Sequence, residues 1–251
     1  MDRLIYTALS GATQTLDRQA VVANNMANAS TVGFKGQLSM FRAVPVNGAG
    51  NATRTIAADT TPAADFAPGV ITQTGRSLDV AIDGDGWLAV QAPDGSEGYT
   101  RAGDLQQDAT GLLRSNGHAV LGEDGNPLVL PLQADVTIAS DGTISALGAG
   151  DRPNTLAQVG TLKLVNPPVA QLGRGGDGLF RLKTAQGEQA GPVAADDSVR
   201  VVSGALEQSN VSPVESMVAM IGNARRFEMQ MKMISTADEN ERGANRLLSL
   251  T

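Results

Sequence analysis

The chain has no cysteine, a single histidine and few aromatic residues, which make up 3% of its 251 residues. Without cysteine it forms neither disulfides nor thiolate metal ligands, and with only one histidine, His118, it has no His/Cys zinc site. A catalytic role for His118 is disfavoured, because no nucleophile motif or carboxylate partner lies near it in the sequence. With so few aromatic residues, we expect a core built from Ala, Val, Leu, Ile and Met.

The chain also lacks an excess of positive charge and any long hydrophobic run. Its net charge is -7 at pH 7 and its pI is about 4.7, which argues against nucleic-acid binding. No run approaches the roughly 18 apolar residues that a membrane-spanning helix needs, so we expect no membrane insertion. The first residues, MDRLIYTALSGATQTLD, lack the apolar segment of a secretory signal. This indicates a cytoplasmic protein, unless the chain leaves the cell by a route other than general secretion.

Apolar residues at both ends of the chain recur at intervals of three and four, the spacing of one helix face. The N-terminal series, interrupted only at polar Gln19, is Ile5, Leu9, Ala12, Leu16, Ala23 and Met26. The C-terminal series, which resumes at Leu247 and Leu248, is Met217, Ile221, Ala224, Phe227, Met231 and Ile234. Ser212-Pro213-Val214-Glu215 supplies an N-cap, a proline at the first helical position and a glutamate three residues after the cap. The sequence therefore predicts an amphipathic helix at each end.

Between these helices the pattern changes. Residues 43–77 are rich in Ala, Thr, Pro and Gly, so we expect an extended linker over 36–77. Residues 78–207 contain short apolar runs separated by turn signals, and Asp141-Gly142 predicts the turn of a hairpin within VTIASDGTISAL. We therefore predict an α+β chain in four parts: an N-terminal helix with an asparagine-rich junction (1–35), the extended linker (36–77), an all-β domain (78–207) and a C-terminal helix (208–251).

The terminal helices need a partner surface, because each large apolar side chain left in water forgoes about 1.5–3 kcal/mol relative to burial. Two arrangements are open. The helices can pair with each other within one chain, or they can pack in a coiled-coil-like core against helices of other chains. Contacts of the second kind are heterologous and build rings or filaments. Asn24, Asn25 and Asn28 fit either arrangement, as a helix C-cap or as neutral amides in a crowded interface between subunits.

The motifs that could carry chemistry are better explained as turns. Gly173–Gly178 fits G-x-G-x-x-G but leads into a strand-like run, whereas a dinucleotide site needs a helix there. Asp83–Gly86 begins like a calcium loop, but Trp87 follows where a ligand would be needed. Acidic residues near the first strands of the β domain are usual in turns. We therefore predict no catalytic, cofactor-binding or metal-binding residues, no cofactor and no enzymatic activity.

Three motifs in order resemble signatures of the bacterial flagellar rod, hook and hook-associated axial proteins. The N-terminal signature is matched by S-G-A at 10–12, A-N-N-M-A-N at 23–28 and then Thr31, Gly33, Phe34 and Lys35. T-G-R-S-L-D-V-A-I-D-G-D-G-W-L-A-V at 74–90 and Y-T-R-A-G-D-L at 99–105 resemble the entry into the family's β domain. S-G-A-L-E-Q-S-N-V-S-P-V-E-S-M-V at 203–218 and R-R-F-E-M-Q at 225–230 resemble the C-terminal signature. The opening residues and F-R-A-V-P-V at 41–46 are most similar to proximal rod members.

This resemblance implies a structural subunit of the flagellar rod, with the terminal helices in the core of a tube and the β domain outside. It implies partnership with other copies and other rod proteins, and export through the flagellar type III apparatus to the periplasmic rod without a cleaved signal peptide. The alternatives are an oligomeric adaptor with a ligand-binding β domain and an enzyme acting on cell-wall glycan. We expect an assembly interface at Ile5, Leu9, Leu16, Asn24, Asn25, Met26, Asn28, Thr31, Gly33, Phe34, Met217, Ile221, Phe227, Met231, Ile234 and Leu248.

Overall fold

The computed structural model describes residues 2–45, 55–59, 63–148, 157–183 and 191–248. The chain folds into two units. The helical unit comprises Met1–Ala29, Gln37–Ala63 and Val211–Thr251, and the β unit comprises Ser30–Gly36 and Ala64–Asn210. The backbone therefore passes from one unit to the other four times. The predicted fold class, a β-rich middle flanked by two terminal helices, is confirmed.

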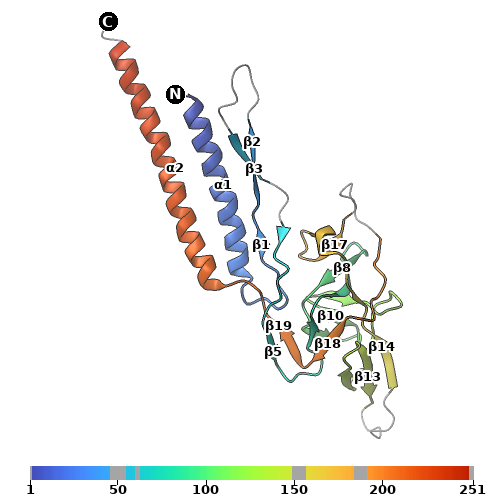
Figure 1. The fold of residues 1–251 in the computed structure, drawn as a ribbon. Helices are drawn as coiled ribbons and strands as arrows, with labels where there is room; N and C mark the ends of the chain where they lie inside the picture. Colours follow the sequence, from blue (N-terminus) through green and yellow to red (C-terminus); the bar gives the residue numbers. More distant parts are fainter. Residues whose placement is uncertain (1, 46–54, 60–62, 149–156, 184–190, 249–251) are drawn as a thin grey trace. The chain divides into compact units, whose positions relative to one another are not determined.

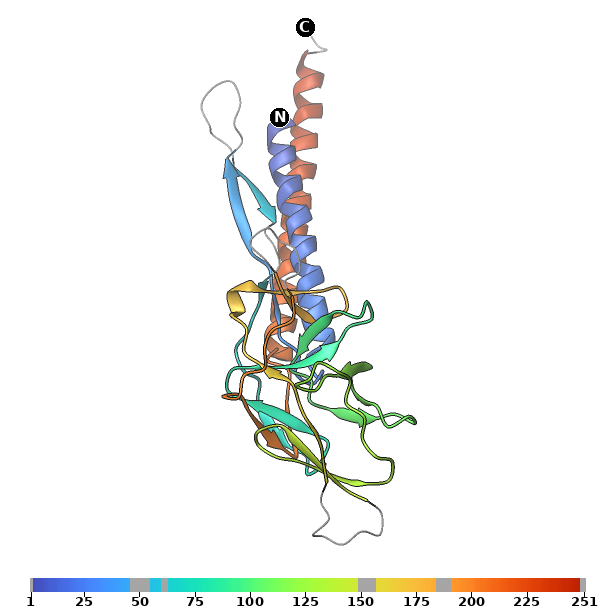
Figure 2. The same cartoon turned by 90° about the vertical axis from the view of Figure 1, so that its right-hand side faces the viewer.

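The helical unit is built on two antiparallel helices that lie side by side, α1 (Asp2–Ala27) and α2 (Pro213–Leu248) (Figures 1 and 2). The predicted start of α2 is confirmed. Pro213 is its first residue, and the Ser212 hydroxyl oxygen accepts a hydrogen bond from the Glu215 N–H at 3.3 Å. The other helix, α1, ends at Ala27, and the Asn28 side chain donates to the Asn24 carbonyl at 2.9 Å.

The segment predicted as an extended linker contains paired strands. In the helical unit, β2 (Phe41–Pro45) and β3 (Thr55–Asp59) form an antiparallel hairpin, and β3 lies beside α1. Two shorter strands, β1 (Gln37–Leu38) and β4 (Ala63–Ala64), form a separate pair. The backbone is extended, as expected, but it is held by strand pairing that the Ala- and Thr-rich composition did not indicate. Residues 46–54 of this segment lie outside the described residues.

The β unit contains an eight-stranded sheet with the order β16-β17-β8-β7-β11-β10-β9, and β15 also pairs with β7. Three smaller sheets are formed by β12-β13-β14, β18-β6 and β19-β5. The strands are β5 (Ile71–Gln73), β6 (Val80–Asp83), β7 (Trp87–Gln91), β8 (Glu97–Thr100), β9 (Leu105–Gln107), β10 (Leu113–Ser115), β11 (His118–Val120), β12 (Asp135–Ile138), β13 (Thr143–Leu147), β14 (Ala157–Thr161), β15 (Leu164–Val165), β16 (Leu172–Arg174), β17 (Phe180–Leu182), β18 (Arg200–Ser203) and β19 (Ala205–Glu207), and a 3-10 turn, η2 (Val169–Gln171), precedes β16.

Strand β7 is buried along most of its length because it is covered on both faces. Leu88 and Val90 belong to a large aliphatic cluster, whereas Trp87 and Ala89 belong to a second cluster with Tyr99 and two phenylalanines. The expectation of a core without aromatic residues is therefore wrong for this second face. The expectation that methionine contributes is also wrong, because no methionine is among the buried hydrophobic residues of the described chain.

The local turn predictions are confirmed. Strands β12 and β13 pair antiparallel, and Gly142 takes the left-handed conformation (φ 86°) in the turn that joins them. Gly173–Gly178 forms the end of β16 and a turn into β17, where the Gly178 N–H donates to the Gly175 carbonyl at 3.2 Å. Asp83–Gly86 ends β6 and turns into β7.

Candidate functional site: assembly surfaces

The residues of the two helices that are fully buried are small or polar, whereas the large apolar residues on these helices are partly buried or exposed. The fully buried residues are spaced by four and three residues on α1 and by seven and fourteen residues on α2: Ala8, Ala12, Thr15, Ser216, Asn223 and Ala237. The Thr15 hydroxyl lies 3.2 Å from Gln230 Oε1, and a Cβ added to Gly11 would lie 2.9 Å from Gln230 Nε2. The helices therefore approach closely where their side chains are smallest. We call this contact the inner seam.

The apolar interface residues predicted on α1 and α2 divide into two groups by their exposure. The first group is about half exposed: Leu9 (51%), Leu16 (52%), Met217 (51%), Ile221 (56%) and Met231 (46%). We call these residues the outer stripes of α1 and α2. The second group is partly buried and comprises Ile5, Met26, Phe227 and Ile234. The side chain of Leu248, at the end of α2, lies outside the described residues.

This division bears on the choice between pairing within and between chains. The two helices do pair with each other within the chain, but the outer stripes are not the residues that this pairing buries. The inner seam is shifted by one residue from Leu9 and Leu16 on α1 and from Met217 on α2, so these larger side chains stay outside it. Pairing within the chain therefore leaves the outer stripes without a covering surface among the described residues of the helical unit.

Two of the three junction asparagines have roles inside the chain. The Asn25 side chain donates to the Gln37 carbonyl at 2.9 Å and accepts from the Gln37 N–H at 2.8 Å. Asn28 caps α1, as described above, and its backbone N–H lies 3.1 Å from the carbonyls of both Asn24 and Asn25. Asn24 is exposed. A C-cap and a strand contact thus account for Asn25 and Asn28 without a neighbouring subunit.

The remaining junction residues belong to the β unit. Gly33 is buried with φ 65°, and a Cβ there would lie 2.2 Å from the Arg101 carbonyl carbon, so only glycine fits. The Arg174 guanidinium lies 4.3 Å from the centre of the Phe34 ring. Thr31 is partly buried, and its carbonyl accepts from the Phe34 N–H at 3.3 Å. These residues fix the chain after α1 onto the β unit, which therefore extends beyond its predicted range of 78–207.

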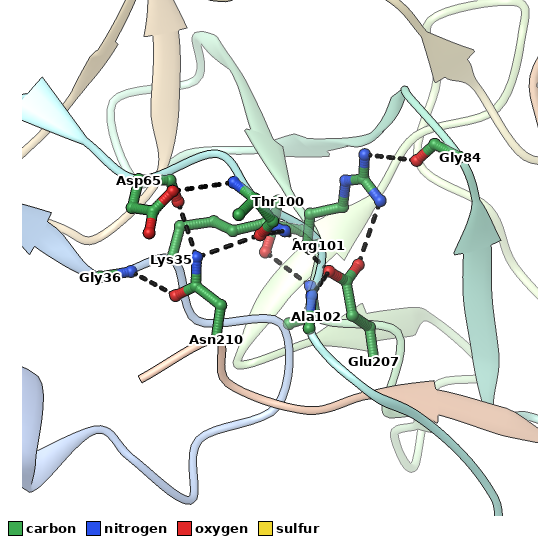
Figure 3. A network of polar contacts seen from close by, with 11 residues as sticks. Lys35, Gly36, Asp65, Gly84, Thr100, Arg101, Ala102, Glu207 and Asn210 are labelled. Carbon is green, nitrogen blue, oxygen red and sulfur yellow. Dashed lines mark hydrogen bonds and ion pairs between the residues drawn. The ribbon is translucent and has the colours of Figure 1, made fainter. Parts of the chain in front are cut away.

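A buried ion cluster lies beside this turn (Figure 3). Glu207 Oε1 accepts from Lys35 Nζ at 2.7 Å and from the Gly69 N–H at 2.8 Å, while Glu207 Oε2 accepts from Arg101 Nη1 at 3.1 Å. Lys35 Nζ also donates to the Ala67 carbonyl at 2.9 Å. The side chains of Lys35 and Glu207 are 1% and 2% exposed. Burial lowers the pKa of the Lys35 ammonium, and the bond to Glu207 opposes that change.

No sequence pattern indicated that these three charged residues meet, although each lies in one of the motifs that resemble the family signatures. Lys35 ends the first motif, Arg101 lies in Y-T-R-A-G-D-L and Glu207 lies in S-G-A-L-E-Q. The cluster thus ties the N-terminal and C-terminal motifs to the central one. Its chemistry is structural, because all of the hydrogen bonds described above stay within the β unit and hold its segments together.

Comparisons with known proteins agree with the motifs. Residues 5–35 match the model of the family described as "Flagella basal body rod protein", residues 81–146 match "Flagellar hook protein FlgE/F/G D1 domain", and residues 202–247 match "Flagellar basal body rod FlgEFG protein C-terminal". Lys35, Arg101 and Glu207 each fall in a different one of these ranges. The chain belongs to the flagellar basal-body rod protein family.

Within this family, the chain is similar over its full length to FlgF proteins and over most of its length to a FlgG protein. It is 57% identical to the flagellar basal-body rod protein FlgF of Salmonella typhimurium and 55% identical to that of Escherichia coli, with 100% of each chain covered. It is also 32% identical to the flagellar basal-body rod protein FlgG of Bacillus subtilis, over 95% of this chain and 96% of the relative. In the part of the chain that the structure describes, no helix is long and apolar enough to cross a membrane.

Proposed function

We propose that this chain is a structural subunit of the proximal flagellar rod, and that it assembles by burying the outer stripes of α1 and α2 against neighbouring subunits. The observation that carries the proposal is the division of the helix faces. The helix residues that are fully buried within the chain are small or polar, and five of the large apolar residues predicted for the interface remain about half exposed. Covering the exposed half of each would contribute about 1 kcal/mol.

The composition of α2 supports this interface. Its outer stripe includes two methionines, and Met229 and Met233 on the same helix are also about half exposed. Methionine is flexible and polarisable, so it packs well against surfaces of differing shape. A subunit that contacts both its own copies and other rod proteins needs such a surface. By contrast, residues 235–246 of α2 are mostly polar and exposed.

The proposal extends to place and export. Membership of the family places the chain in the basal body of the flagellum. We propose further that the rod it joins crosses the periplasm, that the chain transmits torque there, and that it reaches this site through the flagellar type III apparatus without cleavage of a signal peptide. The adaptor alternative gains no support from the comparisons, since the full-length relatives described above are rod proteins.

Ile221→Lys tests the interface, with Asn240→Lys as a matched control. Both positions are exposed on α2, and both changes introduce one lysine, but only Ile221 belongs to an outer stripe. In cells that lack the native protein, we expect Asn240→Lys to restore rods and Ile221→Lys to fail, although both purified variants keep wild-type helical circular dichroism. Normal rods with Ile221→Lys would refute the interface. A closed small oligomer of the wild-type chain, seen by light scattering, would favour the adaptor.

A further inference from the structure

Three of the four places where the backbone enters or leaves the β unit are joined by one side chain, that of Asn210. The β unit begins at Ser30, is left at Gly36, is entered again at Ala64 and is left for the last time at Asn210. These four positions are far apart in the sequence. Three of them nevertheless converge around the carboxamide of Asn210, within the β unit (Figure 3).

Asn210 uses its whole carboxamide for this purpose. Its Oδ1 accepts from the Gly36 N–H at 2.7 Å, and its Nδ2 donates to the carbonyls of Asp65 at 2.9 Å and Ala67 at 3.0 Å. The Asp65 N–H in turn donates to the Gly36 carbonyl at 2.7 Å, and the Asn210 N–H donates to the Phe34 carbonyl at 3.3 Å. The segment that leaves at Gly36, the segment that returns at Ala64 and the final exit are therefore bonded to one another.

The chemistry of this site requires an amide. The site presents one N–H donor and two carbonyl acceptors, and only a side chain with one acceptor and two donors satisfies all three. Aspartate retains the acceptor but turns an oxygen toward the two carbonyls. Alanine leaves all three groups without this partner. The apolar clusters of the β unit contain neither Asn210 nor the residues that it bonds, so the hydrophobic core does not depend on it.

We propose that Asn210 is a positioning residue that binds these backbone crossings into one bundle, so that torque passing between the units is carried by the segments together. The torque role rests on the function proposed above. Each crossing segment is a single backbone strand with rotatable φ and ψ angles, and it twists easily when alone. Cross-linking by hydrogen bonds makes neighbouring segments share the load. The Lys35–Glu207 ion pair fixes the adjoining residues, but Asn210 is the side chain that reaches both Gly36 and Asp65.

Amide hydrogen exchange of the purified full-length chain tests the bundle itself. We expect Asn210→Ala to raise the exchange rate of the Gly36 N–H about tenfold, and to raise that of the Asp65 N–H as well. Asn126→Ala is the matched control, because the Asn126 side chain bonds Asp124 in an exposed turn. Asn210→Asp keeps an acceptor for Gly36, so we expect it to preserve that protection while the Asp65 N–H exchanges faster. Unchanged exchange of both amides in Asn210→Ala overturns the proposal.

Rotation under load tests the mechanical role. In cells that lack the native protein, we expect Asn210→Ala and Asn126→Ala to restore rods and swimming equally in dilute medium. As viscosity is raised, cells with Asn210→Ala should lose speed at least about twofold more than the control. Equal speeds at every viscosity overturn the torque role, even if exchange is faster. Failure of the wild-type chain to restore rods contradicts the proposed function instead, and the exchange result still decides whether Asn210 ties the crossings.

Discussion

Removing the carboxylate of Glu207 is the most direct test of how the β unit holds its terminal segments. Glu207→Ala leaves the Lys35 ammonium and the Arg101 guanidinium buried without the group that neutralises them, and it frees the Gly69 N–H. Breaking a buried ion pair by removing one partner costs about 3–5 kcal/mol. Since domains of this size are stable by about 5–15 kcal/mol, this is a large part of the total. The expected fall in melting temperature is about 6–20 °C.

The single tryptophan of the chain makes the assay specific to this unit. Trp87 is 2% exposed and lies in β7, and the Arg101 guanidinium is 5.4 Å from its ring centre. Its fluorescence during urea or thermal unfolding therefore reports on the β unit and on the cluster. Glu123→Ala is the control, because Glu123 is exposed in the same unit, and we expect it to change the stability by less than about 0.5 kcal/mol.

The charge balance of the cluster predicts an order among variants. Two cations share one carboxylate, so Lys35→Met leaves one guanidinium paired with one carboxylate. We therefore expect Lys35→Met to destabilise the β unit less than Glu207→Ala, although it also loses the bond to the Ala67 carbonyl. A Glu207→Ala variant within about 1 kcal/mol of wild type, or one more stable than Lys35→Met, would refute the electrostatic reasoning.

Three further predictions concern the glycine turn, acid stability and the terminal helices. Gly33→Ala should destabilise the β unit by about 1–3 kcal/mol more than Gly75→Ala in urea unfolding, because both have positive φ but only Gly33 faces backbone at 2.2 Å; equal losses would contradict the packing. Bonds from the Thr110 hydroxyl and Arg114 hold the pKa of Asp108 below its usual 3.8, so the stability they supply is present above about pH 4 and is lost as the pH falls further. Stability measured from about pH 5 to about pH 2 should therefore fall less steeply for Asp108→Asn, and parallel curves would exclude this cause. In dilute wild-type protein, trypsin should cleave residues 1–30 sooner than it cleaves the β unit, since the inner seam fully buries only small or polar side chains. Full protection of residues 1–30 would show that α1 is stably folded without neighbouring subunits.

Much of the local structure was predictable because it depends on neighbouring residues. Ser212 and Pro213 specify the start of α2, and the Asp141-Gly142 turn specifies the β12–β13 hairpin. The motifs around Gly33 and Glu207 identified the family without any structure. The β2–β3 hairpin was not predicted, because Ala- and Thr-rich composition does not distinguish a paired strand from an extended linker.

The choice of helix face was harder to predict. Spacings of three and four identified apolar residues on α1 and α2, but two neighbouring stripes on one helix share that spacing. The sequence grouped Leu9 and Leu16 with Met26, whereas the structure leaves the first two half exposed and Met26 partly buried. Small residues such as Ala8 and Ala12 decide the inner seam by allowing close approach, and a hydrophobicity pattern gives them little weight.

The sequence by itself determined the two terminal helices, their N-cap, the turns of the β domain and membership of the rod family, because each is written in residues close together along the chain. Only the tertiary structure decided that Lys35, Arg101 and Glu207 form one buried cluster and that Asn210 joins the backbone crossings. Glu207 lies 172 residues from Lys35 and 106 from Arg101, so no local pattern links them. A buried carboxylate is stabilised only when folding brings its cations within hydrogen-bonding distance.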